Sequence, residues 1–511
     1  MEKEKWICVF KRRMLLSGFA LAIILSLLLG SSVMAAMDFE IAGRPASIKG
    51  FINQGLSFGI GKDEYFSKQG LQSAIFQLLL EGKYDPSNNI SMFVSGMLNV
   101  DWAYELLSGN QEWNDKRFND SRDRLYILHD YDDLLKEAHV TWKTESFVLR
   151  VGKQIVSWGE TDGVRLADQI NPLDQRRGFG DIKFESTIIP IWLVKAEYFH
   201  KTDSSWLQDL GLEMIFNPNM DFIPDKGLGP GTDYMGIWAP KVNVALGGPF
   251  PFDYAHVGSF DMNTKKPEAF DAAFYEYGVR LKTQIKDTMM TLMYFNGIAN
   301  TPVKIGTGAR AEFAYDGRML LHPQFNGYYP DFRYVGFTLT KDFENLYASS
   351  LGGVAPTVRL ETIYAFDSSF ETSLNTIEKH NEFRWALGID WKINIPLFNP
   401  KAYFTISPQY IQQYVLDYPG SHSLNGLKDI NDTFTLLITT SYMHNKLTPT
   451  FFWWRDTTNE ADYILFKVAY EKDDHWIYTV GTNQFTGTHE GAGFEPFDNK
   501  NQIFCTISYR F

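Results

Sequence analysis

Cysteine is almost absent from this sequence. Only Cys8 and Cys505 occur among its 511 residues. Cys8 precedes an N-terminal apolar run and does not belong to a lipobox. Once that N-terminal part is removed, Cys505 has no partner within the chain and no internal disulfide can form. The sequence therefore excludes the small secreted scaffolds that disulfides hold together.

Long apolar runs are absent after Gly30, where no stretch approaches the about 18 residues that a transmembrane helix needs. Before that point, a basic stretch precedes the run "MLLSGFALAIILSLLLG", and Val33 and Ala35 occupy the small-residue positions that a signal peptidase reads. We predict a cleaved secretory signal peptide at 1–35 and a mature chain at 36–511. A retained membrane anchor is the alternative.

Basic residues are too few for a nucleic-acid-binding protein. The whole chain has a net charge of −13. Without the first 35 residues it keeps 43 basic against 59 acidic residues, a net charge of −16. Because nucleic-acid recognition needs basic patches, we expect no nucleic acid among the partners.

Aromatic residues, in contrast, are abundant. They make up 15% of the chain, with 40 Phe, 26 Tyr and 13 Trp. An exported, aromatic-rich chain without further membrane helices has the profile of an outer-membrane barrel, in which aromatic girdles lie at both membrane interfaces.

Apolar and polar side chains alternate along many segments. Residues 382–394 read "EFRWALGIDWKIN", and the same period of two recurs in 191–199, 273–285, 357–364 and 432–443. Such alternation predicts strands with one lipid-facing and one lumen-facing side. The charged residues expected on the lumen side are Lys195, Glu197, Arg280, Lys282, Arg359, Glu361, Arg384 and Asp390.

The links between these strands alternate in length. Short polar links such as "KTES", "HNK" and "EKDD" are separated by mostly long ones, the longest at about 217–271. This is the pattern of periplasmic turns and external loops, and it predicts an all-β transmembrane antiparallel up-and-down β-barrel. We count about 18 strands, with 16 as the close alternative. The loop 217–271 is either an external cap or a segment that plugs the lumen.

The chain ends in "IFCTISYRF", with Phe511 and Tyr509 on the apolar face of a last strand. We expect this strand to close the ring against the first strand, near 47–60, because a barrel in lipid has no open edge. A terminal aromatic strand of this kind resembles the signal by which the barrel-assembly machinery recognises its clients. That machinery and outer-membrane lipid are therefore expected partners, and the outer membrane the expected location.

The stretch "LRVGKQIVSWGETDGVRLADQINPLD" is the densest local signal. It resembles a domain-of-unknown-function family of Gram-negative outer-membrane, porin-like β-barrels, whose members carry a Gly-Arg/Lys-Gln step, then Trp-Gly-Glu, then Asn-Pro. The matching residues are Gly152, Lys153, Gln154, Trp158, Gly159, Glu160, Asn171 and Pro172. In that family the genes often accompany a resistance-nodulation-division exporter and a lipoprotein-like partner. The resemblance thus implies traffic in apolar molecules or lipids, with an inner-membrane exporter and a periplasmic or lipoprotein carrier as candidate partners.

Alternation in this stretch points Arg150, Gln154 and Trp158 into the lumen and leaves Lys153 on the opposite face, unless it snorkels or the strand bulges. We expect a lumen constriction there, followed by a segment that folds inward and carries Glu160 and Asn171. The alternative is that Glu160 and the Asn-Pro step only pin a loop across the barrel mouth, since buried polar groups need partners in either case.

Several positions on the expected lumen side are apolar, among them Met289, Met293, Leu193 and Phe199. They suit an apolar solute, because methionine adapts to irregular ligands. They suit equally well the packing of an inserted loop, and the sequence leaves both readings open.

Signatures of catalysis and metal binding are missing. The motifs GxSxG, HExxH and GxxxxGK[ST] do not occur, and no cofactor is indicated. "DYDD" at 130–133 could bind calcium, but an acidic solvated loop is the favoured reading, because its spacing lacks the EF-hand pattern. We therefore expect a channel or transporter for small apolar or amphipathic solutes rather than an enzyme. A non-conducting barrel in a lipid-export assembly is the alternative, and a hydrolase the third choice.

Overall fold

The fold is described from a computed structural model of the chain. The signal-peptide prediction lies outside the described residues. The structure describes residues 37–61, 70–107, 121–128, 130–178, 187–202, 204, 206–227, 237–238, 243–245, 254–257, 260–313, 317, 319–344, 354–424, 426–489 and 491–511.

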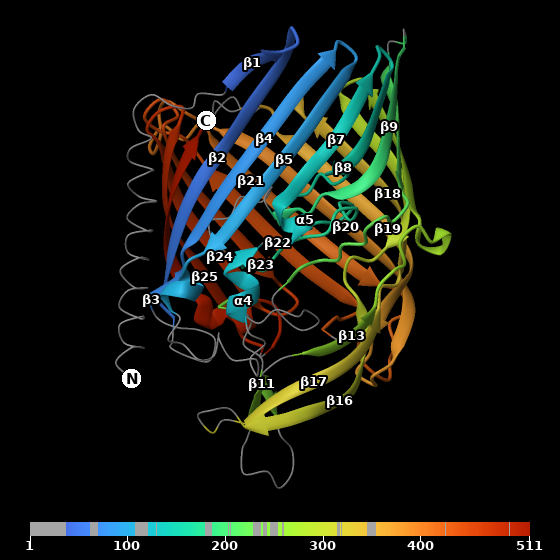
Figure 1. Ribbon diagram of the computed structural model, residues 1–511, viewed down its shortest axis with the longest axis vertical. Coiled ribbons are helices and arrows are strands. Elements are labelled where there is room, and N and C mark those ends of the chain that lie inside the picture. The colour runs from blue at the N-terminus through green and yellow to red at the C-terminus, as the bar shows by residue number, and fades with distance from the viewer. Residues whose placement is uncertain are drawn as a thin grey trace.

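A closed antiparallel barrel of 18 strands forms the body of the described chain, which confirms the predicted fold class and strand number (Figure 1). The wall strands, in order around the ring, are β2 (Arg44–Gly59), β4 (Ile75–Ser87), β5 (Ile90–Asp101), β7 (Leu135–Lys143), β8 (Phe147–Gln154), β9 (Ile191–Lys201), β10 (Leu207–Asn217), β14 (Glu276–Ile285), β15 (Thr288–Ile298), β18 (Asp331–Asp342), β19 (Thr357–Glu371), β20 (Ile377–Ile393), β21 (Phe404–Val415), β22 (Ile430–Thr439), β23 (Leu447–Asp456), β24 (Ala461–Glu471), β25 (Trp476–Gly487) and β26 (Gln502–Arg510).

Shorter elements extend or cover this wall. They are the strands β1 (Met37–Ile41), β3 (Gly70–Ser73) and β6 (Ile127–Leu128), the α-helices α2 (Ala103–Leu106), α4 (Ser121–Leu125) and α5 (Tyr131–Leu134), and the 3-10 helices η2 (Ala272–Phe274) and η5 (Glu495–Lys500). Among the residues that the structure describes, no helix is both long and apolar enough to cross a membrane.

The two faces of the wall follow the alternation in the sequence. On β15, Met293 is 2% exposed and Leu292 is 58% exposed. On β20, Ala386 is buried and its neighbour Leu387 is exposed. The buried set points into the barrel and the exposed set points outward, because successive side chains of a strand take opposite faces.

The ring closes where the sequence predicts it. β26 pairs with β2, with Cys505 opposite Leu56, and Gly50 and Phe511 exchange backbone hydrogen bonds of 2.8 and 3.0 Å. On the inner side, a chain of buried polar groups crosses this seam: Ser508 donates to Asn53, Asn53 to Gln77 and Gln77 to Asn99. Strand pairing and side-chain bonds thus join the first and last strands.

Replacement of Phe511 by Asp should impair this closure. The Phe511 side chain is 8% exposed, because it packs over Gly50 and stacks on Tyr509. A carboxylate there would lose this packing and be buried without a partner. We expect the Phe511→Asp chain to yield less folded barrel in heat-modifiable gel mobility than the conservative Phe511→Tyr chain. Equal yields from both variants would contradict this role.

Turns and loops lie at opposite rims. The rim that holds the C-terminus carries mostly short turns, for example at 144–146, 286–287 and 472–475 (Figure 1, top). The other rim carries the long connections. Two links at this second rim, 372–376 and 457–460, are short, so the expected alternation in loop length is not complete.

A second, smaller sheet projects beyond the long-loop rim (Figure 1, bottom). It joins β11 (Asn243–Ala245), β12 (Tyr254–Val257) and β13 (Asp261–Lys265) to the hairpin of β16 (Val303–Phe313) and β17 (Met319–Tyr328). β13 runs parallel to β17, with Asp261 opposite Gln324. The described strands of the long loop 217–271 therefore belong to this outer sheet.

Candidate functional site

Residues 155–178, which follow β8, fold into the barrel and are called the inward segment below. Its apolar side chains, Val156, Trp158, Leu166, Ala167 and Ile170, are all buried. They form one core with inward-pointing residues of β9, β10, β15, β18, β19, β20 and β21, namely Ile191, Leu193, Ile215, Met293, Phe295, Tyr334, Ile363, Ala365, Ala386 and Ile411. The inward segment thus has a hydrophobic core inside the lumen, where a water-filled pore would have none.

Trp158 is the largest side chain of this core. A Cβ atom on Gly278 would lie 2.5 Å from Trp158 Cη2, so the glycine on β14 leaves the space that the indole fills. The indole Nε1 donates to Glu213 Oε1 at 2.8 Å, and the ring packs edge-on against Phe295. Trp158 therefore fixes the inward segment to the wall by shape and by one directed hydrogen bond.

Glu361 on β19 anchors the next part of the segment. Its buried carboxylate accepts three backbone N–H groups: Glu160 at 2.6 Å and Thr161 at 3.1 Å on Oε2, and Ala167 at 2.5 Å on Oε1. Hydrogen bonds to an ionised group are the strong ones in proteins. One wall carboxylate therefore holds both ends of the loop 160–167.

Gly159 permits this close approach. A Cβ atom at this position would lie 3.0 Å from Asp168 Cβ and 3.5 Å from Glu361 Oε1. In the Trp-Gly-Glu step, the Trp158 indole fills the space beside the wall, Gly159 has no side chain to clash, and the Glu160 N–H donates to Glu361.

The tip of the segment reaches the far side of the lumen. The Asp162 N–H donates to Gln409 Oε1 on β21 at 3.1 Å, and a Cβ on Gly163 would lie 3.5 Å from the ring of Phe452 on β23. Arg359 pairs with Asp162 at 2.5 Å and with Asp390 at 2.9 Å. The inward segment therefore spans the lumen from β10 to β23.

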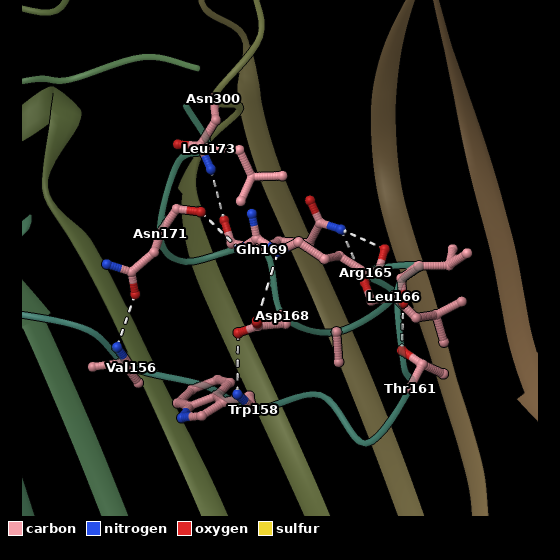
Figure 2. A network of polar contacts seen from close by, with 12 residues as sticks. Val156, Trp158, Thr161, Arg165, Leu166, Asp168, Gln169, Asn171, Leu173 and Asn300 are labelled. Carbon is pink, nitrogen blue, oxygen red and sulfur yellow. Dashed lines mark hydrogen bonds and ion pairs between the residues drawn. The ribbon is translucent and has the colours of Figure 1, made fainter. Parts of the chain in front are cut away.

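Asn171 ties the base of the segment together (Figure 2). Its Oδ1 accepts the Val156 N–H at 2.8 Å, and its Nδ2 donates to the Ile189 carbonyl at 2.9 Å. Pro172 accepts the Ile189 N–H at 2.8 Å. The Asn-Pro step thus joins the outgoing and returning backbone of the β8–β9 connection.

Buried charges hold the last part of the inward segment. Arg176, 2% exposed, pairs with Asp133 of α5 and, at 2.8 Å, with Asp174. Lys226 pairs with Asp132 and, at 3.0 Å, with Asp133. The expectation of a solvated acidic loop at "DYDD" is therefore wrong for Asp132 and Asp133. They lie in an ionic cluster that three separate segments build together.

Acidification should weaken this cluster. Burial raises the pKa of Asp174, but the charge and hydrogen bond of Arg176 outweigh it and hold the pKa below its ordinary 3.8. A carboxyl with a depressed pKa contributes stability that is present above pH 3.8 and lost as the pH falls below it. We expect the urea midpoint of the barrel to fall more between pH 5 and pH 3 in wild type than in Asp174→Asn. The control variant Asp38→Asn, at an exposed site, should show the same fall in urea midpoint as wild type. An equal fall in all three chains would contradict the prediction.

A row of charges crosses the wall beside the inward segment. Glu213 accepts from Arg280 at 2.8 Å and pairs with Lys282 at 2.5 Å. Lys195 and Glu197 pair at 3.1 Å, and Glu197 lies opposite Glu213 on the neighbouring strand. Glu160 lies in the inward segment, and burial raises the pKa of its carboxyl.

Other sequence-predicted residues lie apart from this group. Arg150 donates to Thr141 on β7, and Gln154 donates to the Leu193 carbonyl on β9. Arg384 pairs with Glu382 on its own strand. Met293 belongs to the core under the inward segment, whereas Met289 is 59% exposed.

Lys153 neither snorkels to water nor faces lipid. It is fully buried, its Nζ donates to the Leu135 carbonyl at 2.8 Å, and it lies 4.8 Å from the ring centroid of Tyr131. Helix α5 and the start of β7 therefore cover it. The preceding Gly152 has a φ of +137°, which L side chains rarely adopt.

Sequence reasoning missed many wall residues that contact the inward segment, among them Glu213, Tyr334, Gln409 and Phe452. Tyr334 donates its hydroxyl to the Ala167 carbonyl at 2.7 Å. Alternation places Glu213 and Gln409 on the inner face, but nothing in the sequence tells which inward residues lie opposite an inserted loop. Across the described residues, no group of three or more His, Cys, Asp or Glu side chains is placed to hold a metal ion.

Solved structures similar to this chain are porins and outer-membrane proteins. A BenF-like porin from Pseudomonas fluorescens Pf-5 is 9% identical, with a TM-score of 0.48, 92% of this chain and 98% of that chain covered. Pseudomonas aeruginosa OccK8 (OprE) is 9% identical (TM-score 0.47; 92% and 98% covered), and Acinetobacter baumannii OccAB4 is 11% identical (TM-score 0.47; 91% and 98% covered). These similarities are too low to indicate a solute.

No curated protein matches the chain. A family model does match it, over residues 27–511, which is nearly its whole length. The chain therefore belongs to the family described as protein of unknown function DUF1302.

Proposed function

We propose that this protein is a channel of the Gram-negative outer membrane for small apolar or amphipathic solutes, and that the inward segment controls its opening. The observation that carries this proposal is the way the segment is held. Its wall contacts centre on one carboxylate, that of Glu361, and on one indole, that of Trp158. Because the barrel wall is closed and the inward segment is anchored separately inside it, release of this segment could open the lumen while the wall stays intact. The inward segment is therefore the proposed gate.

The side chains that line the lumen favour a solute with both an apolar and a polar part over a sugar or a free ion. Charged pairs such as Arg280 with Glu213 lie beside apolar groups such as Met289 and Phe199. Pockets that bind amphipathic molecules combine an apolar surface with a few placed polar groups.

A hydrolase is less well supported. On the long-loop rim, Ser421 Oγ lies 3.1 Å from His422 Nδ1, and His422 Nε2 lies 2.9 Å from Glu378. That last approach does not have hydrogen-bond geometry, and among the described residues His422 Nε2 has no hydrogen-bond partner. The relay that a serine nucleophile needs is therefore incomplete.

Planar-bilayer recordings test the channel proposal. We expect wild type to show brief, small current steps. A chain in which residues 157–170 are replaced by a short Gly-Ser linker should show long, large steps. A barrel that stays silent in both forms would refute the channel. Silence would instead support a non-conducting barrel that acts with a resistance-nodulation-division exporter and a lipid carrier.

A further inference from the structure

A cavity of about 600 Å³ lies against the wall on the C-terminal-rim side of the inward segment. Strands β9, β10, β14, β15 and β18 line it, and Glu160 of the inward segment borders it. Its volume is in the range of about 300–1,000 Å³ that small-molecule sites occupy. None of the anchoring contacts of Trp158 or Asn171 uses this space.

One part of the cavity is apolar. Phe199 and Met289 are 44% and 59% exposed, although both point into the lumen. Gly211 lies between neighbouring strands there: a Cβ on it would lie 3.6 Å from Phe199 Cδ1 and 3.6 Å from Lys282 Cβ. The wall thus presents an aromatic ring and a thioether to the cavity, and the glycine leaves the space between Phe199 and Lys282 open.

Another part offers hydrogen-bond donors. Arg280 and Lys282 line the cavity while they share the Glu213 carboxylate. Arg280 Nε is buried, and no described residue accepts its proton. Thr291 and Thr338 add hydroxyl groups, whose oxygens are 2.7 Å apart. Two cationic side chains and two hydroxyl groups therefore line this part of the cavity.

We propose that this cavity binds amphipathic monocarboxylates, with the carboxylate at Arg280 and Lys282 and the apolar body between Phe199 and Met289. This assignment rests on the proposed channel function and specifies its solute class. At this end of the cavity a cationic head would approach two cations, whereas a carboxylate can accept hydrogen bonds from Arg280 and Lys282 beside Glu213.

The cavity also contacts the inward segment, the proposed gate. Glu160 borders the cavity and donates its backbone N–H to Glu361 at 2.6 Å. Arg359 donates to the Glu160 carbonyl. A carboxylate in the cavity therefore lies beside the residue that connects the inward segment to its anchor.

Equilibrium binding of octanoate tests the proposal. We would titrate octanoate, octanol and octylamine into the full barrel in lipid nanodiscs and subtract binding to empty nanodiscs. Wild type should bind octanoate saturably, with one site per chain and at least about tenfold more tightly than either analogue. This preference would correspond to about 1.4 kcal/mol. Absence of saturable octanoate binding would overturn the proposal.

Two variants and one control locate the site. Gly211→Trp should fill the cavity and abolish octanoate binding, whereas Leu212→Trp, on the outward face of the same strand, should leave it unchanged. Arg280→Gln should weaken octanoate about tenfold while octanol binding stays the same, and heat-modifiable mobility shows that each chain is folded. If folded Gly211→Trp binds octanoate as wild type does, the site is elsewhere.

These results are separable from the channel proposal. A barrel that binds octanoate but carries no current would refute the channel and keep the site. A barrel that carries current but binds no octanoate would refute the site alone.

Discussion

Glu361→Gln should convert the channel from mostly closed to mostly open. The variant keeps the size of the side chain but removes the negative charge that receives the N–H groups of Glu160, Thr161 and Ala167. Each hydrogen bond to a charged group is worth about 1.5–3 kcal/mol. Loss of about 3 kcal/mol in all would shift the equilibrium between the anchored and released segment about a hundredfold.

Single-channel recordings would measure this shift as an increase in open probability. Glu471→Gln is the matched control, because this carboxylate is exposed at the C-terminal rim and pairs with Arg510 rather than with the inward segment. An open probability of Glu361→Gln equal to that of wild type would show that Glu361 does not hold the gate.

Trp158→Ala should release the inward segment through a different contact. The substitution removes a fully buried indole that fills the space beside Gly278 and donates to Glu213. Truncation of a buried tryptophan costs about 3–5 kcal/mol. Because the wall strands keep their ladders, we expect this loss to appear in the docking of the segment rather than in the barrel.

Limited proteolysis of the purified barrel would show whether the inward segment is released while the wall stays folded. Trp158→Ala should be cut within residues 157–170 at least about a hundredfold faster than wild type, since cleavage follows the open population of a segment. Trp206→Ala, an exposed tryptophan at a turn of the C-terminal rim, should be cut at the wild-type rate. Equal cleavage of all three chains would mean that Trp158 does not dock the segment.

The wall could be predicted from the sequence because alternation is a local property. Strand β20 shows this: its apolar and polar residues separate by position alone, and a single register satisfies lipid outside and water inside. Closure of β26 on β2 was predictable for a similar reason, because a barrel in lipid leaves no strand edge unpaired.

The interior could not be predicted in the same way. Met289 and Met293 share one face of β15, yet the inward segment buries one and leaves the other beside a cavity. Which of them it covers depends on how far residues 155–178 reach across the lumen. That reach is set by contacts of the segment with strands far away in the chain, those of Asp162 with Gln409 and of Gly163 with Phe452. Alternation along a single strand holds no information about them.

The central claim is that Glu361 holds the backbone of the inward segment inside the lumen. Hydrogen–deuterium exchange of peptides covering 155–170, measured in the folded barrel, tests it most directly, because amide exchange reports local opening. We predict that the amides of Glu160, Thr161 and Ala167 are protected at least about a hundredfold in wild type and that Glu361→Gln removes most of this protection. Exchange of these amides in wild type at the rate of an unstructured peptide would contradict the claim.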